Sequence, residues 1–181
     1  MFAEKGFSES RMDDVVEASG LGKGTVYWHF KSKENLLAAV MRRFLSLELR
    51  RLERAAPRDG PVAERLLAFF RRIAQELKGV GALMPVSLEF YAIALRREWA
   101  RALLRDYYAE FRRALLGLLQ AGVDRGEFRP VPLEDCAVVL CALMEGLILT
   151  WVVDSRTVRI DDHTEAALRL VLDGLRCRPT G

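Results

Sequence analysis

Basic, hydroxyl-bearing and aromatic side chains gather in one short stretch of this chain, residues 20–33. No acidic residue falls between Glu17 and Glu34. Side chains of these kinds donate hydrogen bonds to the phosphate oxygens and base edges of nucleic acids. Those in the stretch are Lys23, Thr25, Tyr27, Trp28, His29, Lys31 and Lys33. The stretch therefore predicts a surface that contacts nucleic acid.

Two short helices separated by a tight turn are expected to position these side chains. The first would be capped by Ser10, with Asp13 as its third residue, and its apolar side would consist of Met12, Val15, Val16 and Ala18. Gly20 can adopt the left-handed backbone that ends one helix and lets the next begin within a few residues. Leu21 and Val26 are expected to fill the small core between the two helices. The pattern predicts a helix-turn-helix.

The same residues are similar to the DNA-binding domain of the TetR family of one-component repressors. The matching residues are Gly6-Phe7, Ser10, Met12, Asp14-Val15, Ala18 to Leu21, Lys23 to Tyr27, His29 to Glu34 and Leu36-Leu37. Residues 143–147, Leu-Met-Glu-Gly-Leu, are similar to a step in a late helix of the family. The resemblance implies a homodimer that binds a palindromic operator and is released from it by a small molecule. It also implies that the family's first helix, whose tail would be residues 1–7, is truncated here.

The DNA-binding residues follow from this resemblance and from the types of the side chains. Lys23 and Thr25 are predicted to contact bases, Gly24 permits close approach, and Trp28 is expected to reach the groove. The resemblance assigns Tyr27, His29 and Lys33 to the phosphate backbone. The full predicted set is Ser10, Lys23, Gly24, Thr25, Tyr27, Trp28, His29 and Lys33. Gly22 departs from the family, which commonly has a serine that caps the second helix.

Charge, cysteine content and hydrophobicity indicate the class of protein and its location. A net charge of +3 is only weakly basic, so the local clustering carries the nucleic-acid prediction. Three cysteines without a repeating spacing favour a reducing compartment, and the N-terminus lacks the pattern of an export signal, so a cytoplasmic location is expected. The longest apolar run, residues 136–153, is broken by Glu145 and Gly146 and is too short to span a membrane comfortably, so a buried or dimer-forming helix is expected there.

Helical periodicity accounts for the remainder of the chain and predicts an all-α fold. A long helix is expected from Ser32 to about Ala55, followed by a boundary at residues 57–61, Pro-Arg-Asp-Gly-Pro. Five further helices are expected over residues 61–78, 85–95, 97–123, 133–153 and 162–175. We therefore predict a helix-turn-helix DNA-binding domain at residues 1–45 and a helical-bundle domain for effector binding and dimerisation at residues 46–181.

Aromatic and methionine side chains in the second domain are candidates to line an effector pocket. They are Phe69, Ile73, Met84, Leu88, Phe90, Tyr91, Trp99, Tyr107, Phe111, Met144 and Trp151. Each taken alone is more often a core residue than a pocket residue. Together, with few charges among them, they predict a lipophilic effector.

The last two helices are the expected dimer surface. Their apolar residues at helical spacing are Leu140, Leu143, Leu147, Leu168, Leu172 and Leu175, and Gly146 allows close approach. The alternative is that these residues form a core within one chain, and a mixture of both uses is expected.

Two other classes of function are alternatives to the DNA-binding regulator. The chain has two histidines, His29 and His163, and neither has a carboxylate at the spacing of a helical metal site, so neither an enzyme nor a metal or other cofactor is expected. A helical interaction or membrane-surface module without sequence-specific DNA binding is the remaining alternative, based on the arginine-rich amphipathic helices.

Overall fold

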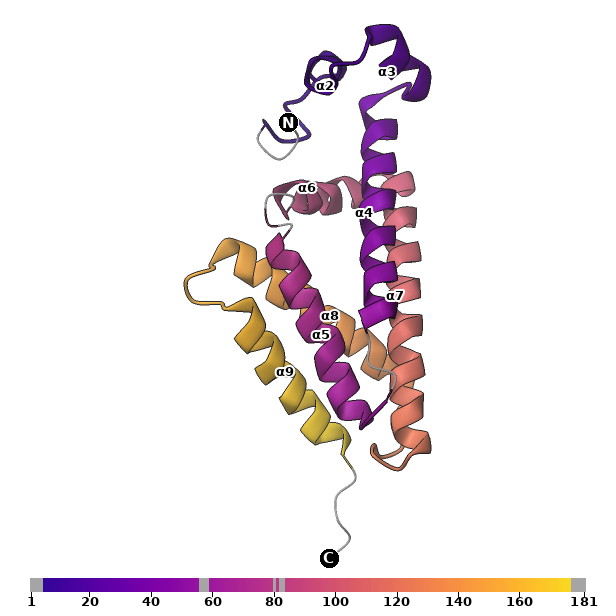
Figure 1. Ribbon diagram of the computed structural model, residues 1–181, viewed down its shortest axis with the longest axis vertical. Coiled ribbons are helices and arrows are strands. Elements are labelled where there is room, and N and C mark those ends of the chain that lie inside the picture. Colours follow the sequence, from indigo (N-terminus) through magenta and orange to yellow (C-terminus); the bar gives the residue numbers. More distant parts are fainter. Residues whose placement is uncertain (1–4, 56–58, 80, 82–83, 177–181) are drawn as a thin grey trace, which may run out of the picture. The chain divides into compact units, whose positions relative to one another are not determined.

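The computed structural model describes residues 5–55, 59–79, 81 and 84–176, and within them the side chains of all but residues 47–55. The regular structure of this part is helical and contains no strand, which confirms the all-α prediction (Figure 1). The helices are α2 (Met12–Ser19), α3 (Lys23–His29), α4 (Lys33–Ala55), α5 (Val62–Gly79), α6 (Met84–Ala94), α7 (Glu98–Asp124), α8 (Leu133–Val153) and α9 (Ile160–Leu175). Residues 1–4, most of the expected helix tail, lie outside the described residues.

The predicted helices after residue 61 are confirmed, with ends that differ by one or two residues. The bounds of α8 are those predicted. Helix α9 begins at Ile160 rather than at Asp162, and this places Asp161 and Asp162 in its first turn. Acidic side chains in a first turn stabilise a helix because they face the positive end of its dipole.

The chain divides into two compact units. Unit 1 consists of residues 1–48 and 80–107, and unit 2 consists of residues 49–79 and 108–181. Helix α7 contributes its first part to unit 1 and the remainder to unit 2. These units are defined by compactness, so the functional domains at residues 1–45 and 46–181 stay a prediction.

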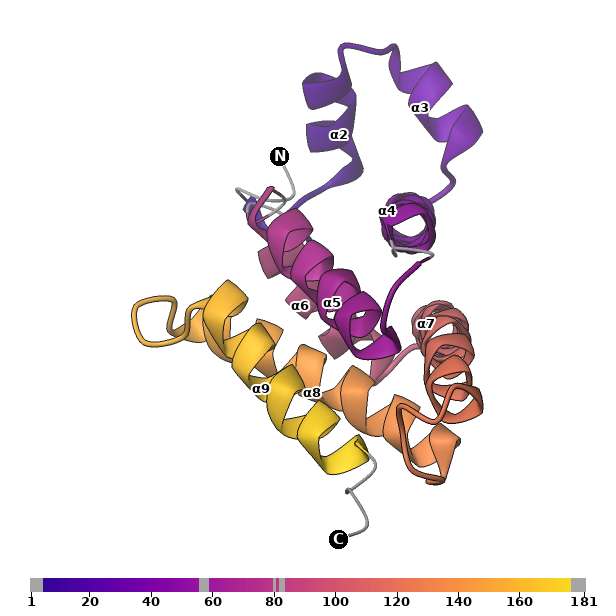
Figure 2. The same cartoon turned by 60° about the horizontal axis from the view of Figure 1, so that its bottom comes forward.

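In unit 2, helices α5, α8 and α9 lie side by side (Figures 1 and 2). Helix α9 packs against both α5 and α8. Phe69 and Phe70 of α5 contact Phe111 of α7, with ring centroids 5.7 and 6.3 Å away. The three rings are at most 5% exposed and form the aromatic centre of this unit.

The loop after α7 joins three segments of unit 2. Phe128 is buried against Gly122, where a Cβ atom would lie 2.2 Å from the ring. The carboxylate of Glu127 accepts a hydrogen bond from the Val62 backbone N–H at 2.7 Å, at the start of α5. The backbone N–H of Arg129 donates to the Leu175 carbonyl at 2.9 Å, at the end of α9. The loop thus connects the beginning of α5, the end of α7 and the end of α9.

In unit 1, α2 packs against α3, and α6 lies with the first part of α7. Leu37 and Met41 of α4 are buried. Phe90 of α6 is fully buried, and its ring centroid lies 5.8 Å from that of Trp99 in α7. Unit 1 therefore contains the helix-turn-helix residues together with α6.

Candidate nucleic-acid interface

Helix α2 begins at Met12, and an acidic side chain closes its first turn. The Asp14 carboxylate accepts hydrogen bonds from the Arg11 backbone N–H at 2.6 Å and from Lys5 Nζ at 2.8 Å. The bond from Lys5, followed by the bond from the Arg11 backbone, holds the pKa of Asp14 below its usual value. Arg11 occupies the N-cap position, so the prediction that Ser10 caps this helix is wrong.

Ser10 instead belongs to the turn before α2. Its side chain is only 2% exposed, and its hydroxyl donates to the Gly6 carbonyl. The backbone between these two residues therefore forms a closed loop with an internal hydrogen bond. The sequence predicted a bond from the Ser10 side chain forward to the helix, whereas the hydroxyl bonds back to Gly6. Serine is favoured both at helix caps and in turns, so its type alone does not distinguish the two.

The turn between α2 and α3 forms as predicted at Gly20 and differs at Leu21. Gly20 has a φ of +66°, the left-handed conformation that ends α2, and its backbone N–H donates to the Glu17 carbonyl. Val26 is buried between the helices. Leu21 is 54% exposed, so the prediction that it fills this core is wrong. Leu21 follows the left-handed Gly20 and lies outside α2, so the helical spacing of apolar residues does not predict which way its side chain faces.

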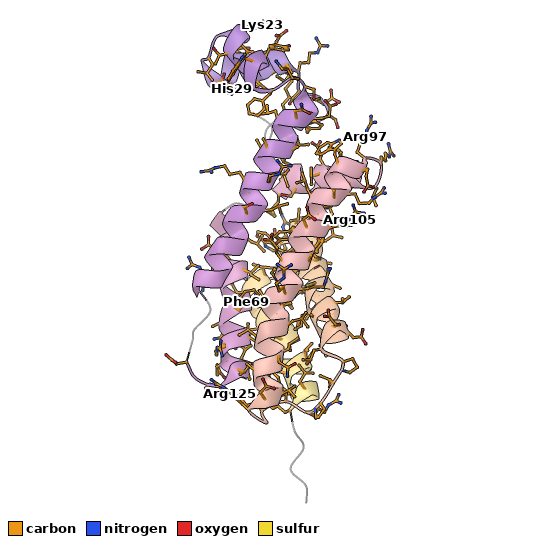
Figure 3. The ribbon with its side chains drawn as sticks, turned by 90° about the vertical axis from the view of Figure 1, so that its right-hand side faces the viewer. Lys23, His29, Phe69, Arg97, Arg105 and Arg125 are labelled. Carbon is orange, nitrogen blue, oxygen red and sulfur yellow. The ribbon has the colours of Figure 1, made fainter. Side chains whose placement is uncertain are left out.

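Helix α3 presents most of its side chains to solvent. Trp28 is 72% exposed, and its ring meets His29 edge to face with centroids 4.6 Å apart. Lys23 and His29 lie on this short helix at the end of unit 1 (Figure 3). The exposed residues of α3 are Lys23, Gly24, Thr25, Tyr27, Trp28 and His29, all of them in the predicted DNA-binding set. The fold thus exposes these six residues together on one helix.

One acidic side chain moderates the charge of α3. Lys23 Nζ lies 2.8 Å from the Asp13 carboxylate, and both side chains are about two-thirds exposed, 66% and 69%. The hydrogen bond to Asp13 raises the pKa of Lys23. Because both partners are solvated, the ion pair contributes little to stability.

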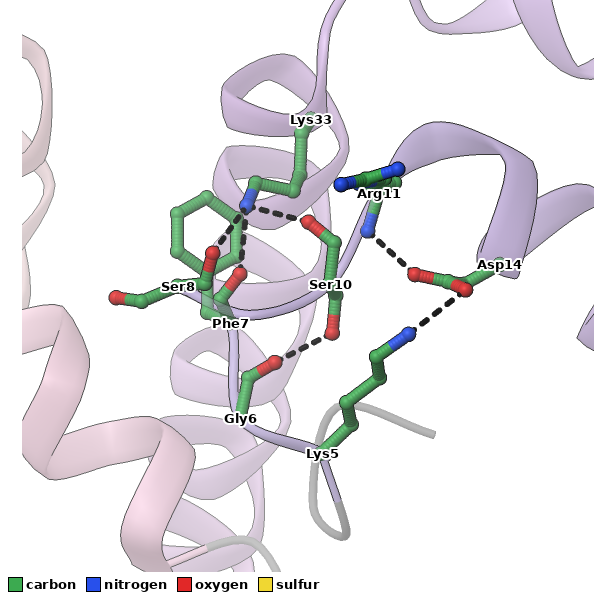
Figure 4. Close-up of polar contacts among 8 residues, drawn as sticks. All are labelled: Lys5, Gly6, Phe7, Ser8, Ser10, Arg11, Asp14 and Lys33. Carbon is green, nitrogen blue, oxygen red and sulfur yellow. Dashed lines mark hydrogen bonds and ion pairs between the residues drawn. The ribbon is translucent and has the colours of Figure 1, made fainter.

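Lys33 directs its ammonium group inward. Nζ donates to the backbone carbonyls of Phe7 at 2.7 Å, Ser8 at 3.2 Å and Ser10 at 2.6 Å (Figure 4). It also lies 4.4 Å from the centroid of the Phe7 ring. These contacts satisfy the three donors of a lysine ammonium group. Its predicted bond to phosphate stays a prediction.

The start of α4 is capped as the sequence predicts. The Asn35 backbone N–H donates to the Ser32 hydroxyl at 3.2 Å, which is the geometry of an N-cap. A bond to its own backbone, followed by one from the Ser32 side chain, lowers the pKa of the neighbouring Glu34. This cap fixes the point at which the chain leaves α3 and enters α4.

The predicted effector-pocket residues are distributed over both units. Phe69, Ile73, Phe111, Met144 and Trp151 belong to unit 2, and Met84, Leu88, Phe90, Tyr91, Trp99 and Tyr107 belong to unit 1. All of them are buried or half-buried. Thr164 is the buried polar side chain among the described residues of unit 2, and its hydroxyl has no hydrogen-bond partner there. That the eleven predicted residues form an effector pocket stays a prediction.

The predicted dimer residues divide between the core and the surface. Leu140, Leu168, Leu172 and Leu175 are buried within the chain, which is the alternative use that the sequence left open. Leu143 and Leu147 are half-buried, and Gly146 is exposed. Other apolar side chains of α8 and α9 are exposed instead, namely Val138, Val139, Leu149, Val153 and Leu170. Sequence periodicity identified the apolar helices without separating their two faces.

Helix α8 has the length and composition of a membrane span. Length and composition alone are weak evidence of a span, because the core helix of a soluble protein also meets them. The helix is longer than the apolar run, because it begins at Leu133 and has 21 residues, so the expected limit on length does not apply to it.

A glycine-containing turn between two short helices, the second exposing lysine, threonine and aromatic side chains, defines a helix-turn-helix DNA-binding protein. Comparison with known families agrees and is more specific. Residues 1–40 match the bacterial regulatory proteins of the tetR family, and residues 61–176 match the C-terminal region of BetI-type transcriptional repressors. The chain belongs to the TetR family of DNA-binding transcriptional regulators.

Individual relatives and solved structures agree with this family. The chain is 34% identical over 150 residues to the HTH-type transcriptional regulator YfiR of Bacillus subtilis (strain 168), covering 82% of this chain and 73% of that protein. Its fold is similar to that of FadR from Bacillus subtilis in complex with stearoyl-CoA, with a TM-score of 0.82, 21% identity, and 97% and 94% of the two chains covered. A transcriptional regulator from Saccharomonospora viridis in complex with choline also has a TM-score of 0.82, with 22% identity and 98% and 92% covered.

Proposed function

We propose that this regulator is a homodimeric repressor that leaves a palindromic operator when a small lipophilic effector binds. The observation that carries the DNA-binding part is helix α3, because its exposed side chains are those that hydrogen-bond to bases and phosphates. The reaction class is binding and release, without chemical conversion. The families matched over residues 1–40 and 61–176 consist of transcriptional regulators rather than enzymes.

The proposed reading of DNA assigns different tasks to the residues of α3. Lys23 and Thr25, in its first turn, contact base edges, and Gly24 lets the backbone approach the groove. Trp28 packs against base or sugar, while Tyr27 and His29 donate to phosphates. The internal contacts of Ser10 and Lys33 support a different role, in which both act on DNA by holding the turn before α2.

Dimerisation is proposed through the exposed apolar face of α8 with its neighbour α9. One recognition helix contacts too few bases to locate a site in a genome, whereas two helices spaced by one turn of DNA read a palindrome. Gly146 is exposed on α8 and would let a partner helix approach. A four-helix bundle from two copies would cover Val139, Leu149 and Val153.

A lipophilic effector is proposed because the described core of unit 2 is almost entirely apolar. Phe69, Phe70 and Phe111 form its aromatic centre, and Thr164 is the buried polar side chain there. A long hydrocarbon chain would match such surroundings, and any charged headgroup attached to it would have to lie outside this apolar centre. FadR of Bacillus subtilis, which shares the fold, binds stearoyl-CoA in its crystal.

Selection from genomic DNA tests the proposal. The protein is incubated with genomic fragments at fixed salt, and the bound fragments are sequenced. We expect a palindromic sequence to be enriched, and release of that fragment by stearoyl-CoA but not by choline. Enrichment of no sequence would overturn the repressor proposal, and release by choline alone would overturn the lipophilic effector.

A membrane-surface module is the second candidate, favoured by the amphipathic helix α5, which carries Arg65, Arg71 and Arg72. Its test is co-sedimentation with vesicles of anionic phospholipid. The repressor proposal expects a cytoplasmic protein that stays in the supernatant as a dimer. Binding to vesicles by a protein that enriches no DNA sequence would favour this second candidate.

A further inference from the structure

Phe7 is held from opposite sides by two helices of unit 1. Its backbone N–H donates to the Glu89 carboxylate of α6 at 2.5 Å. Its backbone carbonyl accepts from Lys33 Nζ of α4 at 2.7 Å, and the same ammonium group lies over its ring (Figure 4). Charged side chains therefore bind both the backbone N–H and the backbone carbonyl of Phe7. Hydrogen bonds to ionised partners are about twice as strong as neutral ones.

The turn around Phe7 is built for this contact with α6. Gly6 has a φ of +79°, and a Cβ atom at this position would lie 3.0 Å from Glu89 Oε1. A side chain at position 6 would therefore be strained and would press on the carboxylate. The Ser10 hydroxyl closes the turn by donating to the Gly6 carbonyl, and Ser10 and Phe7 are both buried.

Lys33 and Glu89 lie in the two different regions of the chain that match the TetR family. Lys33 lies in the region matched at residues 1–40, and Glu89 lies in the region matched at residues 61–176. Helix α2 begins at Met12, five residues after Phe7. A change in the position of α6 would thus be transmitted through the Glu89 carboxylate to the backbone that leads into the DNA-reading helices.

We propose that Glu89 is a positioning residue for DNA binding, which together with Lys33 clamps Phe7 and fixes the start of α2. The proposal rests on the proposed repressor function for its link to DNA. The clamp itself is a property of the free protein. Glu89 touches no DNA in this arrangement and acts through the position of residues 6–10.

Amide hydrogen exchange tests the clamp without DNA. Exchange of the Phe7 amide is compared in wild type, Glu89→Leu, Glu89→Gln and the control Glu110→Gln, an exposed glutamate of α7 in unit 2. Leucine removes the acceptor while keeping the size, whereas glutamine retains a carbonyl acceptor. We expect exchange about tenfold or more faster in Glu89→Leu, partial protection in Glu89→Gln and wild-type protection in Glu110→Gln. Unchanged exchange in Glu89→Leu would overturn the clamp.

DNA binding tests the consequence. The probe is the genomic fragment that wild type enriches most strongly, measured at several salt concentrations. We expect Glu89→Leu to bind about tenfold more weakly, with the preferred sequence and the salt slope unchanged, since no phosphate contact is lost. Glu89→Gln should recover much of the affinity. A changed salt slope, equal losses in both variants, or wild-type affinity in Glu89→Leu would contradict the positioning role.

The two proposals fail in different ways. If wild type enriches no fragment, the repressor function fails, while the exchange result still decides whether Phe7 is clamped. If wild type enriches a site and Glu89→Leu binds it equally well, the function stands and the positioning role is wrong.

Discussion

At the residue scale, the acidic neighbour of Lys23 has a testable effect on DNA binding. Asp13 lies 2.8 Å from Lys23 and also adds a negative charge beside the proposed interface. We expect Asp13→Asn to strengthen DNA binding by about threefold at low salt, with a smaller gain at high salt because both charges are exposed and screened. Fluorescence anisotropy of a labelled operator measures this. Asp124→Asn, which changes an exposed acid in unit 2, is the control, and an equal gain in both variants would show a nonspecific charge effect.

Thr25 and Lys33 differ in what their loss should change. Thr25 is exposed in the first turn of α3, so Thr25→Ala should alter which bases are preferred. Lys33 donates to three backbone carbonyls, so Lys33→Ala should weaken binding to every sequence without changing its salt slope. A slope smaller by about one would instead show that Lys33 binds a phosphate. Selection on randomised operators and salt titrations make these measurements.

Two glycines of α7 offer a matched pair for stability. A Cβ at Gly122 would lie 2.2 Å from the buried Phe128 ring, whereas one at Gly117 would meet nothing within 4 Å. We expect Gly122→Ala to destabilise the protein by about 1–3 kcal/mol through overpacking, and Gly117→Ala to stabilise it by up to about 1 kcal/mol through helix propensity. Denaturant unfolding measures both. If the two variants changed the free energy of unfolding equally, the Phe128 loop would have to move and make room for the added methyl group.

At the element scale, an ion-pair network joins α5 to α9. Glu165 of α9 accepts from Arg71 of α5 at 2.9 Å and from Arg169, one turn along α9, at 2.8 Å. These two bonds, that from Arg71 first, lower the pKa of Glu165 to about 2 from 4.5. The carboxylate is ionised at neutral pH, so the contribution of this network to stability is complete above about pH 5 and is lost as the pH falls toward 2.

The pH dependence of this network can be measured directly. We expect the melting temperature of wild type to fall between pH 5 and pH 2 more steeply than that of Glu165→Gln, which cannot titrate. The difference should shrink in high salt, because the side chains are partly exposed. Parallel melting curves for the two proteins across this range would show that Glu165 has an ordinary pKa.

The helices themselves were largely predictable from the sequence, and the turns were less so. Prolines, glycines and apolar spacing marked the bounds of α5 to α9 because those signals act locally. The predictions for Ser10 and Leu21 are wrong because each residue lies at a junction, where it can belong to either of two elements. The inward contacts of Lys33 and the bond from Phe7 to Glu89 join positions 26 and 82 residues apart, a distance over which no periodicity carries information.

At the scale of the whole molecule, the proposed pairing of two copies through α8 and α9 can be tested by the oligomeric state. Leu149 of α8 is 49% exposed, and Leu95, before α7, is 79% exposed. If two copies pair through α8 and α9, Leu149→Glu should give a monomer that binds a palindromic operator at least tenfold more weakly. Leu95→Glu is the matched control and should remain a dimer. Light scattering after size-exclusion chromatography measures the mass, and a dimeric Leu149→Glu would place the interface elsewhere.

The loop after α7 has a consequence for the order of events during synthesis. It bonds to the start of α5 through Glu127 and to the last residue of α9 through Arg129. A ribosome synthesises a chain from its N-terminus, so the helix-turn-helix is made before Leu175. Unit 2 cannot complete this junction until Leu175 has been synthesised. A prematurely terminated chain would therefore present recognition helices without the finished unit that is proposed to pair them, and it would not compete for the operator as a dimer.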